Sequence, residues 1–308
     1  MPVVTRIGHM ALVAFVVVFV AFGLIHIAPG DPALNVLGQR ADPQLIAEFH
    51  HRMHLDQPLP TQFGIFLKNV LSGDFGTSLL PGNPAVSDII FPALGVTAAL
   101  AGLTVLFALV IAIPLGLTAG IYANRFPDFV IRSIMIILLA TPAFFTGFLL
   151  LLLALKTGFA PVGGWGTGVG GWLSHLWLPA LCLAGFLAPI FGRSLRQSVI
   201  TTLKQDFIES ALARGVRPRK LVLRHVLPNS LLPLITLVGY SAGTLMAGAV
   251  VIETIFNLPG LGSRLASAVA NRDFPVIQGA ALLAALVVVA ANALTDVAYQ
   301  FIDPRTRP

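Results

Sequence analysis

The sequence has few charged residues and almost no cysteine. Only 10% of its 308 residues are charged, whereas 56% are hydrophobic, and the mean hydropathy is +0.88. An average soluble domain is about a quarter charged. This chain therefore lacks the polar surface that a soluble globule needs, which excludes a cytosolic enzyme and a disordered protein. The single cysteine, Cys182, cannot form an internal disulfide, so a disulfide scaffold is excluded as well.

Long apolar runs are abundant, and they predict an all-α polytopic membrane protein with six transmembrane helices. A span needs roughly 20 apolar residues to cross about 30 Å of hydrocarbon. The fourth run is the weakest, because His175, Pro179 and Pro189 interrupt it. The first has no small-residue cleavage site after it, so we interpret it as a retained helix. The six runs cover residues 7–27, 93–121, 131–155, 172–191, 231–252 and 276–299.

The placement of Lys and Arg predicts that both termini lie in the cytoplasm. Positive residues are enriched in the cytoplasmic loops of membrane proteins. With the N-terminus inside, thirteen of the 19 Lys and Arg residues fall on the cytoplasmic side, eight of them in residues 193–229. The net charge of +6 is thus largely a topology signal, which argues against nucleic-acid binding. The predicted location is a membrane that borders the cytoplasm.

The predicted spans divide the chain into four parts. A loop of about 60 residues is far longer than the 12 to 15 residues beyond which loops are usually functional or structured, so we expect an extracytoplasmic subdomain after the first span. The parts are the N-terminal helix 1–28, the extracytoplasmic subdomain 29–92, the core membrane domain 93–301 with a basic loop at 193–229, and the cytoplasmic tail 302–308.

The basic loop predicts two short helices separated by a glycine. Gly215 is suited to a left-handed helix end, and Arg214 is favourably placed at the negative end of the helix dipole. Pro218 suits the first turn of the second helix, which we expect Pro228 to end. On pattern alone an ordinary solvated loop remains equally acceptable. The residues expected on one face of the first helix are Phe207, Ile208, Ala211 and Leu212.

One string in this loop resembles a known signature. Glu209-Ser210-Ala211, Gly215 and Leu227-Pro228 match the spacing of the E-A-A signature of ABC importer permeases, with Ser210 and His225 as departures. In that family the loop is the coupling segment that docks on a cytoplasmic ATPase. The resemblance implies a type-1 ABC importer transmembrane domain, whose coupling residues here are Asp206, Glu209, Ser210, Ala211, Arg214, Gly215, Leu227 and Pro228.

Further strings resemble the dipeptide/oligopeptide (peptide/nickel) type of these permeases. This resemblance implies one half of a heterodimeric pore that imports di- or oligopeptides, with a second permease, two ATPases and an extracytoplasmic substrate-binding protein as partners. Import of nickel or another small solute is the alternative within the same group. The same resemblance implies that the chain lies in the bacterial cytoplasmic (inner) membrane. The strings are Ala28-Pro29-Gly30-Asp31-Pro32, Leu55-Asp56-Gln57-Pro58-Leu59-Pro60, Gly73-Asp74-Phe75-Gly76-Thr77-Ser78, Val250-Val251-Ile252-Glu253-Thr254-Ile255-Phe256, Pro259-Gly260-Leu261-Gly262, Arg272-Asp273-Phe274-Pro275-Val276-Ile277-Gln278-Gly279 and Asp303-Pro304-Arg305.

The chain itself shows no signature of a cofactor or metal site. Lys156-Thr157 lacks the glycine framework of a phosphate-binding loop, so ATP and Mg²⁺ are expected on the partner ATPases. His50, His51 and His54 could be read as metal ligands, but a site would want more ligands with outer-shell support. We therefore favour surface histidines on an amphipathic helix.

Buried charge separates ATP-driven from ion-coupled transporters. A stand-alone secondary transporter, the alternative from a different class, usually carries ionisable residues near the membrane midplane. Here the spans are nearly free of them, and Glu253 and Asp296 lie near span ends. Glu253 is a candidate pore-mouth residue, although an interfacial cap role is equally compatible with its position.

Overall fold

The fold is helical in the computed structural model, which describes residues 3–27, 31, 33–34 and 41–302. Within these residues the only extended pairing is an isolated β-bridge between Thr77 and Ala85, which confirms the all-α expectation. Residue contacts divide the chain into two compact units. One comprises Met1–Thr97 with Pro259–Ala290, and the other Ala98–Leu258 with Ala291–Pro308.

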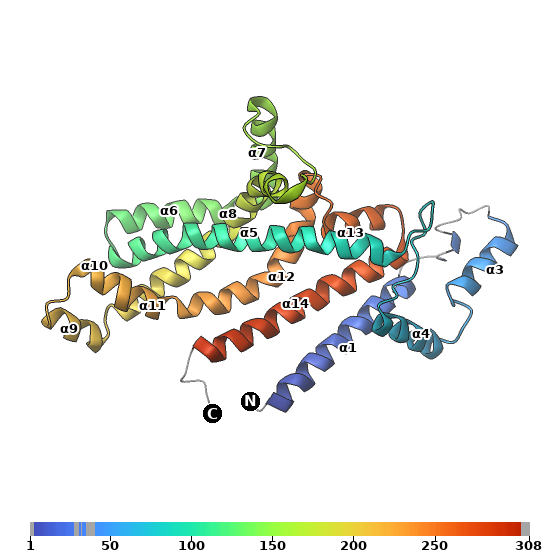
Figure 1. Cartoon of the computed structure of the whole chain (residues 1–308), viewed down its shortest axis with the longest axis horizontal. Helices are drawn as coiled ribbons and strands as arrows, with labels where there is room; N and C mark the ends of the chain where they lie inside the picture. The colour runs from blue at the N-terminus through green and yellow to red at the C-terminus, as the bar shows by residue number, and fades with distance from the viewer. Residues whose placement is uncertain (1–2, 28–30, 32, 35–40, 303–308) are drawn as a thin grey trace. The chain divides into compact units, whose positions relative to one another are not determined.

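Figure 1 shows the helices of the chain, two of which, α5 and α14, run from one unit into the other. Their bounds are α1 Val3–Ile27, α3 Pro43–Arg52, α4 Leu59–Ser72, α5 Val86–Ile121, α6 Phe126–Ala140, α7 Ala143–Thr157, α8 Gly168–Thr202, α9 Asp206–Ala213, α10 Pro218–Leu221, a π-helical turn Val222–Val226, α11 Leu227–Ser230, α12 Leu232–Ile255, α13 Leu261–Ala270 and α14 Phe274–Ile302.

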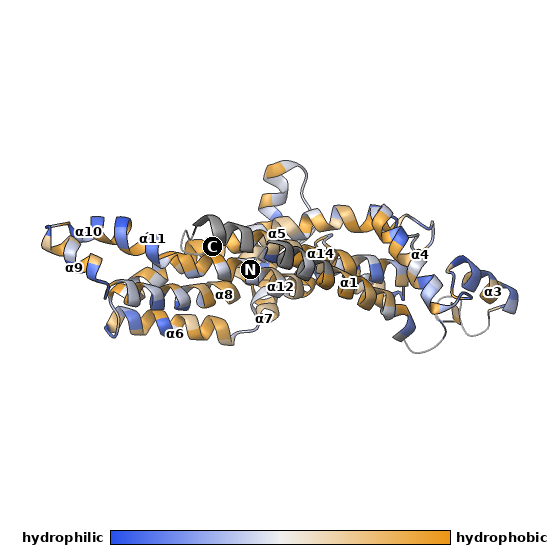
Figure 2. Ribbon diagram, turned by 90° about the horizontal axis from the view of Figure 1, so that it is seen from below, coloured by the Kyte–Doolittle hydropathy of each residue, from blue (hydrophilic) through white to orange (hydrophobic). Residues whose placement is uncertain are grey.

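Four of the described helices are long and apolar enough to cross a membrane. They are α5, α8, α12 and residues Phe274–Thr295 of α14, and α6 with α7 makes a fifth if this bent pair is one span. In α1, the apolar stretch found within the described residues is Leu12–Gly23. Figure 2 shows hydrophobic residues along these helices and hydrophilic ones gathered on α9, α10 and α3. Six spans and cytoplasmic termini stay predictions.

The predicted third span, residues 131–155, is not one helix. α6 ends at Ala140 and α7 begins at Ala143, with an angle of 92° between them. Proline disfavours the helical conformation in the residue before it, and Thr141 is accordingly extended with φ −85° and ψ 119°. The bend lies at Pro142, and residues 131–155 stay a predicted span, which the structure shows as a bent pair of helices.

The predicted fourth span, expected to be the weakest, forms the centre of the second unit. α8 contacts α6, α7, α11 and α12, and 56% of its most apolar window is buried. Pro179 and Pro189 both lie inside the unbroken helix. A helix surrounded by other helices does not need a uniformly apolar surface against lipid, and its neighbours can satisfy backbone groups that proline leaves free.

Aromatic and amide contacts join the helices of the first unit. Phe63 of α4 packs edge-on against Phe15, Phe19 and Phe22 of α1, with ring centroids 5.4 to 5.9 Å apart. The side-chain amide of Gln278 on α14 donates to the carbonyls of Ala21 and Phe22, 3.2 and 3.4 Å away. These contacts fix α1 against α4 and α14.

A buried carboxylate holds the segment before α5 in the same unit. Asp273 is fully buried and accepts a hydrogen bond from the Ser78 hydroxyl and a second, of 3.2 Å, from the backbone N–H of Leu79. On α5, Thr97 accepts a 2.8 Å hydrogen bond from the backbone N–H of Leu261, the first residue of α13. We call residues 29–92, which are predicted to be extracytoplasmic, the outer loop. The contacts of Asp273 tie the end of this loop to the residues just before α14.

Candidate functional site

The first helix of the basic loop ends at the predicted glycine. α9 runs from Asp206 to Ala213, and Gly215 has the left-handed φ of +76°. The backbone N–H of Val216 donates to the carbonyl of Ala211 (3.2 Å), and that of Gly215 donates to Leu212 (2.9 Å). Together these bonds form a Schellman motif, which satisfies carbonyls that the helix end would otherwise leave unpaired. The direction of the chain after α9 is therefore fixed by its backbone.

The apolar face of α9 is buried at its centre and exposed at its edges. Ile208 and Ala211 are 2% and 1% exposed, whereas Phe207 and Leu212 are 42% and 50% exposed. At 3.6 residues per turn these four side chains span an arc of about 140°, with Phe207 and Leu212 at its limits. The face was predicted correctly, but this chain covers only its middle. We call Phe207 and Leu212 the open edge of α9.

The second helix begins at Pro218, as predicted, but Pro228 does not end it. α10 continues through the π-helical turn into α11, which contains Pro228 in its first turn. Pro228 thus lies inside a continuous run of helical backbone, and the π-helical turn directly before it adjusts the hydrogen bonds around the missing N–H. The side-chain amide of Asn229 donates to the carbonyl of His225 over 2.7 Å. The expectation that Pro228 stops the helix was therefore wrong.

The two ends of this segment meet in a buried hydrogen bond. The Ser230 hydroxyl, at the end of α11, donates to Oγ1 of Thr202, at the end of α8, over 3.1 Å. Ser230 is fully buried and Thr202 is 8% exposed. We call residues 203–229 the coupling segment; Figure 1 shows α9, α10 and α11 together at one end of the second unit.

The structure places all predicted coupling residues in this segment, but not with the same access to solvent. We expected the small side chain of Ala211 to allow close approach of a partner. Ala211 is instead buried within this chain, where its small size allows α9 to pack closely against the rest of the chain. The exposed ones are Asp206, Glu209, Ser210, Arg214, Gly215 and Pro228, whereas Leu227 is half-buried and Ala211 is buried.

Glu253, the candidate pore-mouth residue, is fully buried near the end of α12. Its backbone carbonyl accepts a 2.8 Å hydrogen bond from the N–H of Leu258, which closes the turn after the helix. In this conformation the Glu253 side chain does not contact solvent.

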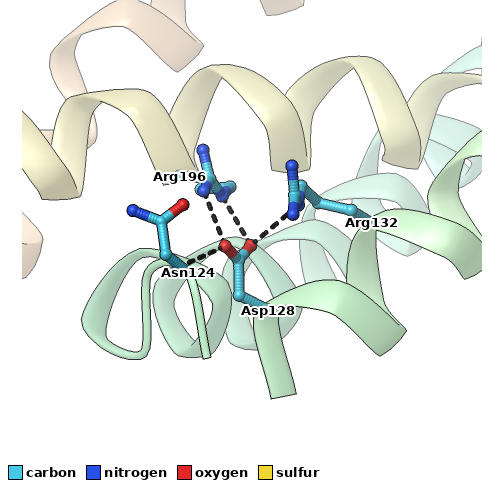
Figure 3. Close-up of polar contacts among 4 residues, drawn as sticks. All are labelled: Asn124, Asp128, Arg132 and Arg196. Atoms are coloured by element: carbon cyan, nitrogen blue, oxygen red, sulfur yellow. Dashed lines mark hydrogen bonds and ion pairs between the residues drawn. The ribbon is translucent and has the colours of Figure 1, made fainter. Parts of the chain in front are cut away.

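Asp128 is a buried carboxylate that the sequence reading missed. Its two oxygens accept hydrogen bonds from Nε and Nη2 of Arg196, both at 2.7 Å, and Oδ2 accepts a third from the backbone N–H of Asn124 at 2.8 Å (Figure 3). Nε of Arg132 lies 3.4 Å from Oδ1. Asp128 is fully buried, and Arg196 is 15% exposed. The signal available in the sequence was an acidic residue directly after Pro127, with a basic residue on either side of it within four positions.

The histidines of the outer loop pair with carboxylates. Nε2 of His50 lies 2.8 Å from Asp31, and Nδ1 of His51 lies 3.1 Å from Asp56. Partial burial raises the pKa of Asp31, but hydrogen bonds from His50 and the N–H of Ala33 lower it, and the net direction is down. A search of the described residues finds no group of three or more metal-ligating side chains.

A cavity of about 210 Å³ lies in the first unit, and this loop forms part of its lining. The last turns of α1, the middle of α4 and the start of α14 form its wall, so it lies where α1 and α14 meet the outer loop. The lining includes Phe22, His26, Gln62, Phe66, Phe75 and Gln278.

Two family models match the chain over nearly all of its length. Residues 112–308 match the binding-protein-dependent transport system inner membrane component, and residues 2–101 match the N-terminal region of such membrane components. The first match alone covers more than half of the chain.

Full-length relatives agree with these matches. The chain is 34% identical over 309 residues to the glutathione transport system permease protein GsiC of Salmonella choleraesuis, covering 99% of this chain and 98% of that protein. It is 36% identical over 296 residues to GsiC of Pectobacterium atrosepticum, covering 95% and 94%. The protein of the same name from Escherichia coli K12 is 34% identical over 309 residues, covering 99% and 98%.

A solved structure shares the fold. An inward-facing form of the MetNI methionine ABC transporter aligns with a TM-score of 0.58 at 17% identity, covering 69% of this chain and 95% of the other. The family models, the full-length relatives and the shared fold all indicate the same family. The chain belongs to the family of binding-protein-dependent transport system inner membrane components, as an ABC importer permease subunit of the peptide/nickel type that acts in the bacterial inner membrane and is not an enzyme.

Proposed function

We propose that this permease imports short peptides or peptide-like solutes. The relatives that cover almost the whole chain are named glutathione permeases, and glutathione is itself a short peptide. The family description supports a substrate-binding protein that delivers the cargo. We further propose a second permease as the other half of the pore, and two cytoplasmic ATPases that bind ATP and Mg²⁺. Family membership argues against a stand-alone secondary transporter.

The observation that carries the ATP-driven mechanism is the open edge of α9. Phe207 and Leu212 are large apolar side chains that are exposed on α9 beside the polar residues Asp206, Glu209 and Ser210. Exposed apolar patches rimmed by polar residues mark protein interaction sites. The Schellman turn at Gly215 holds this edge in a fixed orientation, as a docking surface for an ATPase requires. Movement of the docked ATPase would carry α9 with it and change the membrane helices from outward-open to inward-open.

The exposed face of α12 supports a water-filled route for the cargo. This face carries the hydroxyls of Thr236, Tyr240 and Thr244, and Tyr240 is 76% exposed near the middle of the helix. Hydroxyl groups are unfavourable against hydrocarbon, and tyrosines in membrane proteins are enriched at the two interfaces rather than at the centre. The exposed side chains of α7, such as Phe148 and Leu152, are apolar by contrast. We infer that α12 borders the route and α7 faces lipid.

A role for Glu253 at the pore mouth depends on a second conformation. The side chain is fully buried here, so it can contact cargo only when the end of α12 is uncovered. Alternating access supplies such a conformation, because each gate closes in one state and opens in the other. The proposal therefore places Glu253 at the gate that is shut in this structure.

Reconstitution tests the function directly. The chain is purified with a tag from its own membranes in mild detergent, and mass spectrometry identifies the subunits that come with it. The complex is placed in liposomes with ATP on the ATPase side and the binding protein on the other, and uptake of labelled glutathione and of a labelled dipeptide is measured.

We expect uptake that needs both ATP and the binding protein, with ADP-loaded vesicles as the control. A complex that takes up neither peptide but accumulates another solute would contradict the substrate proposal. Transport driven by an ion gradient without ATPases would contradict the ATP-driven mechanism.

A further inference from the structure

Asp128 joins α6 to α8 through several bonds that fix their relative position. Arg196 approaches the carboxylate with two parallel N–H groups at 2.7 Å, the bidentate geometry that sets orientation as well as distance. The N–H of Asn124, in the turn between α5 and α6, adds a third bond. The turn after α5, helix α6 and helix α8 therefore converge on one buried side chain (Figure 3).

The pair lies next to the point where the coupling segment leaves the membrane helices. Arg196 is in the last two turns of α8, which ends at Thr202, just before α9 begins at Asp206. The Thr202–Ser230 hydrogen bond closes the base of the segment beside it. This part of α8 is therefore one of the two connections between α9 and the long helices, the other being α11 with α12.

Close packing leaves little room for α5, α6 and α8 to slide past one another at this end. A Cβ added to Gly120 on α5 would lie 2.6 Å from Cβ of Val199 on α8, and one added to Gly192 on α8 would lie 2.3 Å from Cε of Met135 on α6. The helices are thus in direct contact on both sides of the ion pair, and the pair fixes their rotation where packing fixes their separation.

Stability alone does not account for a buried ion pair. Removing two charges from water costs free energy that their attraction often does no more than offset, and an apolar pair of similar size frequently stabilises as well. What a bidentate pair adds is one defined register between two helices. The location of this one, beside the coupling segment, indicates where such a register is needed.

We infer that Asp128 and Arg196 are positioning residues that fasten the root of the coupling segment to α5 and α6, so that motion of α9 moves these helices as one body. This inference rests on the proposed ATP-driven function. Without the pair, α8 can turn against α6, and the motion of a docked ATPase is lost before it reaches the membrane helices.

The test compares transport with ATP hydrolysis in the reconstituted complex. The variants are Asp128→Asn, Arg196→Lys, which keeps the charge but loses the fork of donors, and the exchange Asp128→Arg with Arg196→Asp. Arg193→Gln, an exposed residue of the same helix, is the matched control. We expect each single variant to assemble with the ATPases and hydrolyse ATP, but to import about tenfold fewer molecules per ATP.

The exchange should recover part of that loss, and Arg193→Gln should behave as the wild type. Assembly is measured as the amount of ATPase that is recovered with the permease. If Asp128→Asn does not assemble, the inference is tested with Arg196→Lys. An assembled Arg196→Lys transporter with the wild-type ratio of uptake to ATP hydrolysis would overturn the inference alone. A wild-type complex without ATP-dependent uptake would overturn the proposed function, and the inference with it.

Discussion

The backbone N–H of Val216 donates to the carbonyl of Ala211 over 3.2 Å, and the two residues can meet only because Gly215 between them has a φ of +76°. An ideal Cβ at Gly215 would meet nothing within 4 Å, so space is not the constraint. The constraint is the left-handed backbone, which costs a residue with a side chain roughly 1 to 2 kcal/mol.

Gly215→Val should therefore abolish uptake while leaving membrane insertion intact. A β-branched residue disfavours the left-handed conformation most strongly, so the turn after α9 changes direction and the open edge no longer docks. Uptake in cells and the amount of chain in the membrane fraction are the two measurements. Gly215→Asn is the control, because asparagine tolerates this conformation and should retain most uptake. Normal uptake by Gly215→Val would rule out the docking model.

Removal of the open edge should weaken ATPase binding without unfolding the permease. Phe207 and Leu212 are about half exposed, so a partner that covers them gains about 1 kcal/mol from each. Loss of both corresponds to roughly a 30-fold weaker complex. The double variant Phe207→Ser, Leu212→Ser should release the ATPase during purification but keep the wild-type melting temperature. Ile208→Ser, at the buried centre of the same face, should instead lower that temperature.

Water should reach Tyr240 but not the exposed face of α7. The lone cysteine, Cys182, is buried and can be replaced by serine to give a background without thiols. In that background, Tyr240→Cys should react with a charged thiol reagent and Phe148→Cys should not, because only the first faces the proposed route. Labelling is read by mass shift. Equal protection of both thiols would show that the hydroxyl face of α12 is not hydrated.

The outer loop should loosen when Asp273 loses its hydroxyl partner. Ser78→Ala removes the hydroxyl that donates to the buried carboxylate and leaves the Leu79 N–H bond in place, which costs about 1 to 3 kcal/mol. Hydrogen exchange in residues 74–79 should accelerate. Ser87→Ala, the same change at a partly buried serine whose contact with Asp88 is 3.5 Å long, should leave exchange unchanged. Similar exchange in both variants would mean that Asp273 does not hold the loop.

Local signals predicted the coupling segment well. Gly215, Pro218 and the apolar spacing of α9 each act within a few residues, so the helix ends at residues 213 and 218 follow from the sequence. The split of the apolar face was not predictable, because it depends on which neighbouring parts of the chain cover Ile208 and Ala211. Pro228 was misread because the π-helical turn before it lets the helical backbone continue through a proline.

Long-range relationships were harder to predict. Hydropathy located the apolar runs, but it could not show that residues 131–155 turn through 92° or that the proline-containing run at 172–191 is the central helix. Asp128 was overlooked because its partner, Arg196, lies 68 positions away in the sequence and was counted among the loop charges. No local pattern distinguishes a paired arginine from a solvated one.

The length of α8 determines how far from the bilayer ATP-driven motion is received. Its 35 residues extend about 52 Å, whereas a helix at the average tilt needs about 32 Å to cross the hydrocarbon. Roughly a third of the length of α8 therefore exceeds what the hydrocarbon requires, and its last turns, packed against α5 and α6, carry the coupling segment beyond the apolar layer. The stiffness of this end of α8 determines how much of a bound partner's movement is transmitted to the pore.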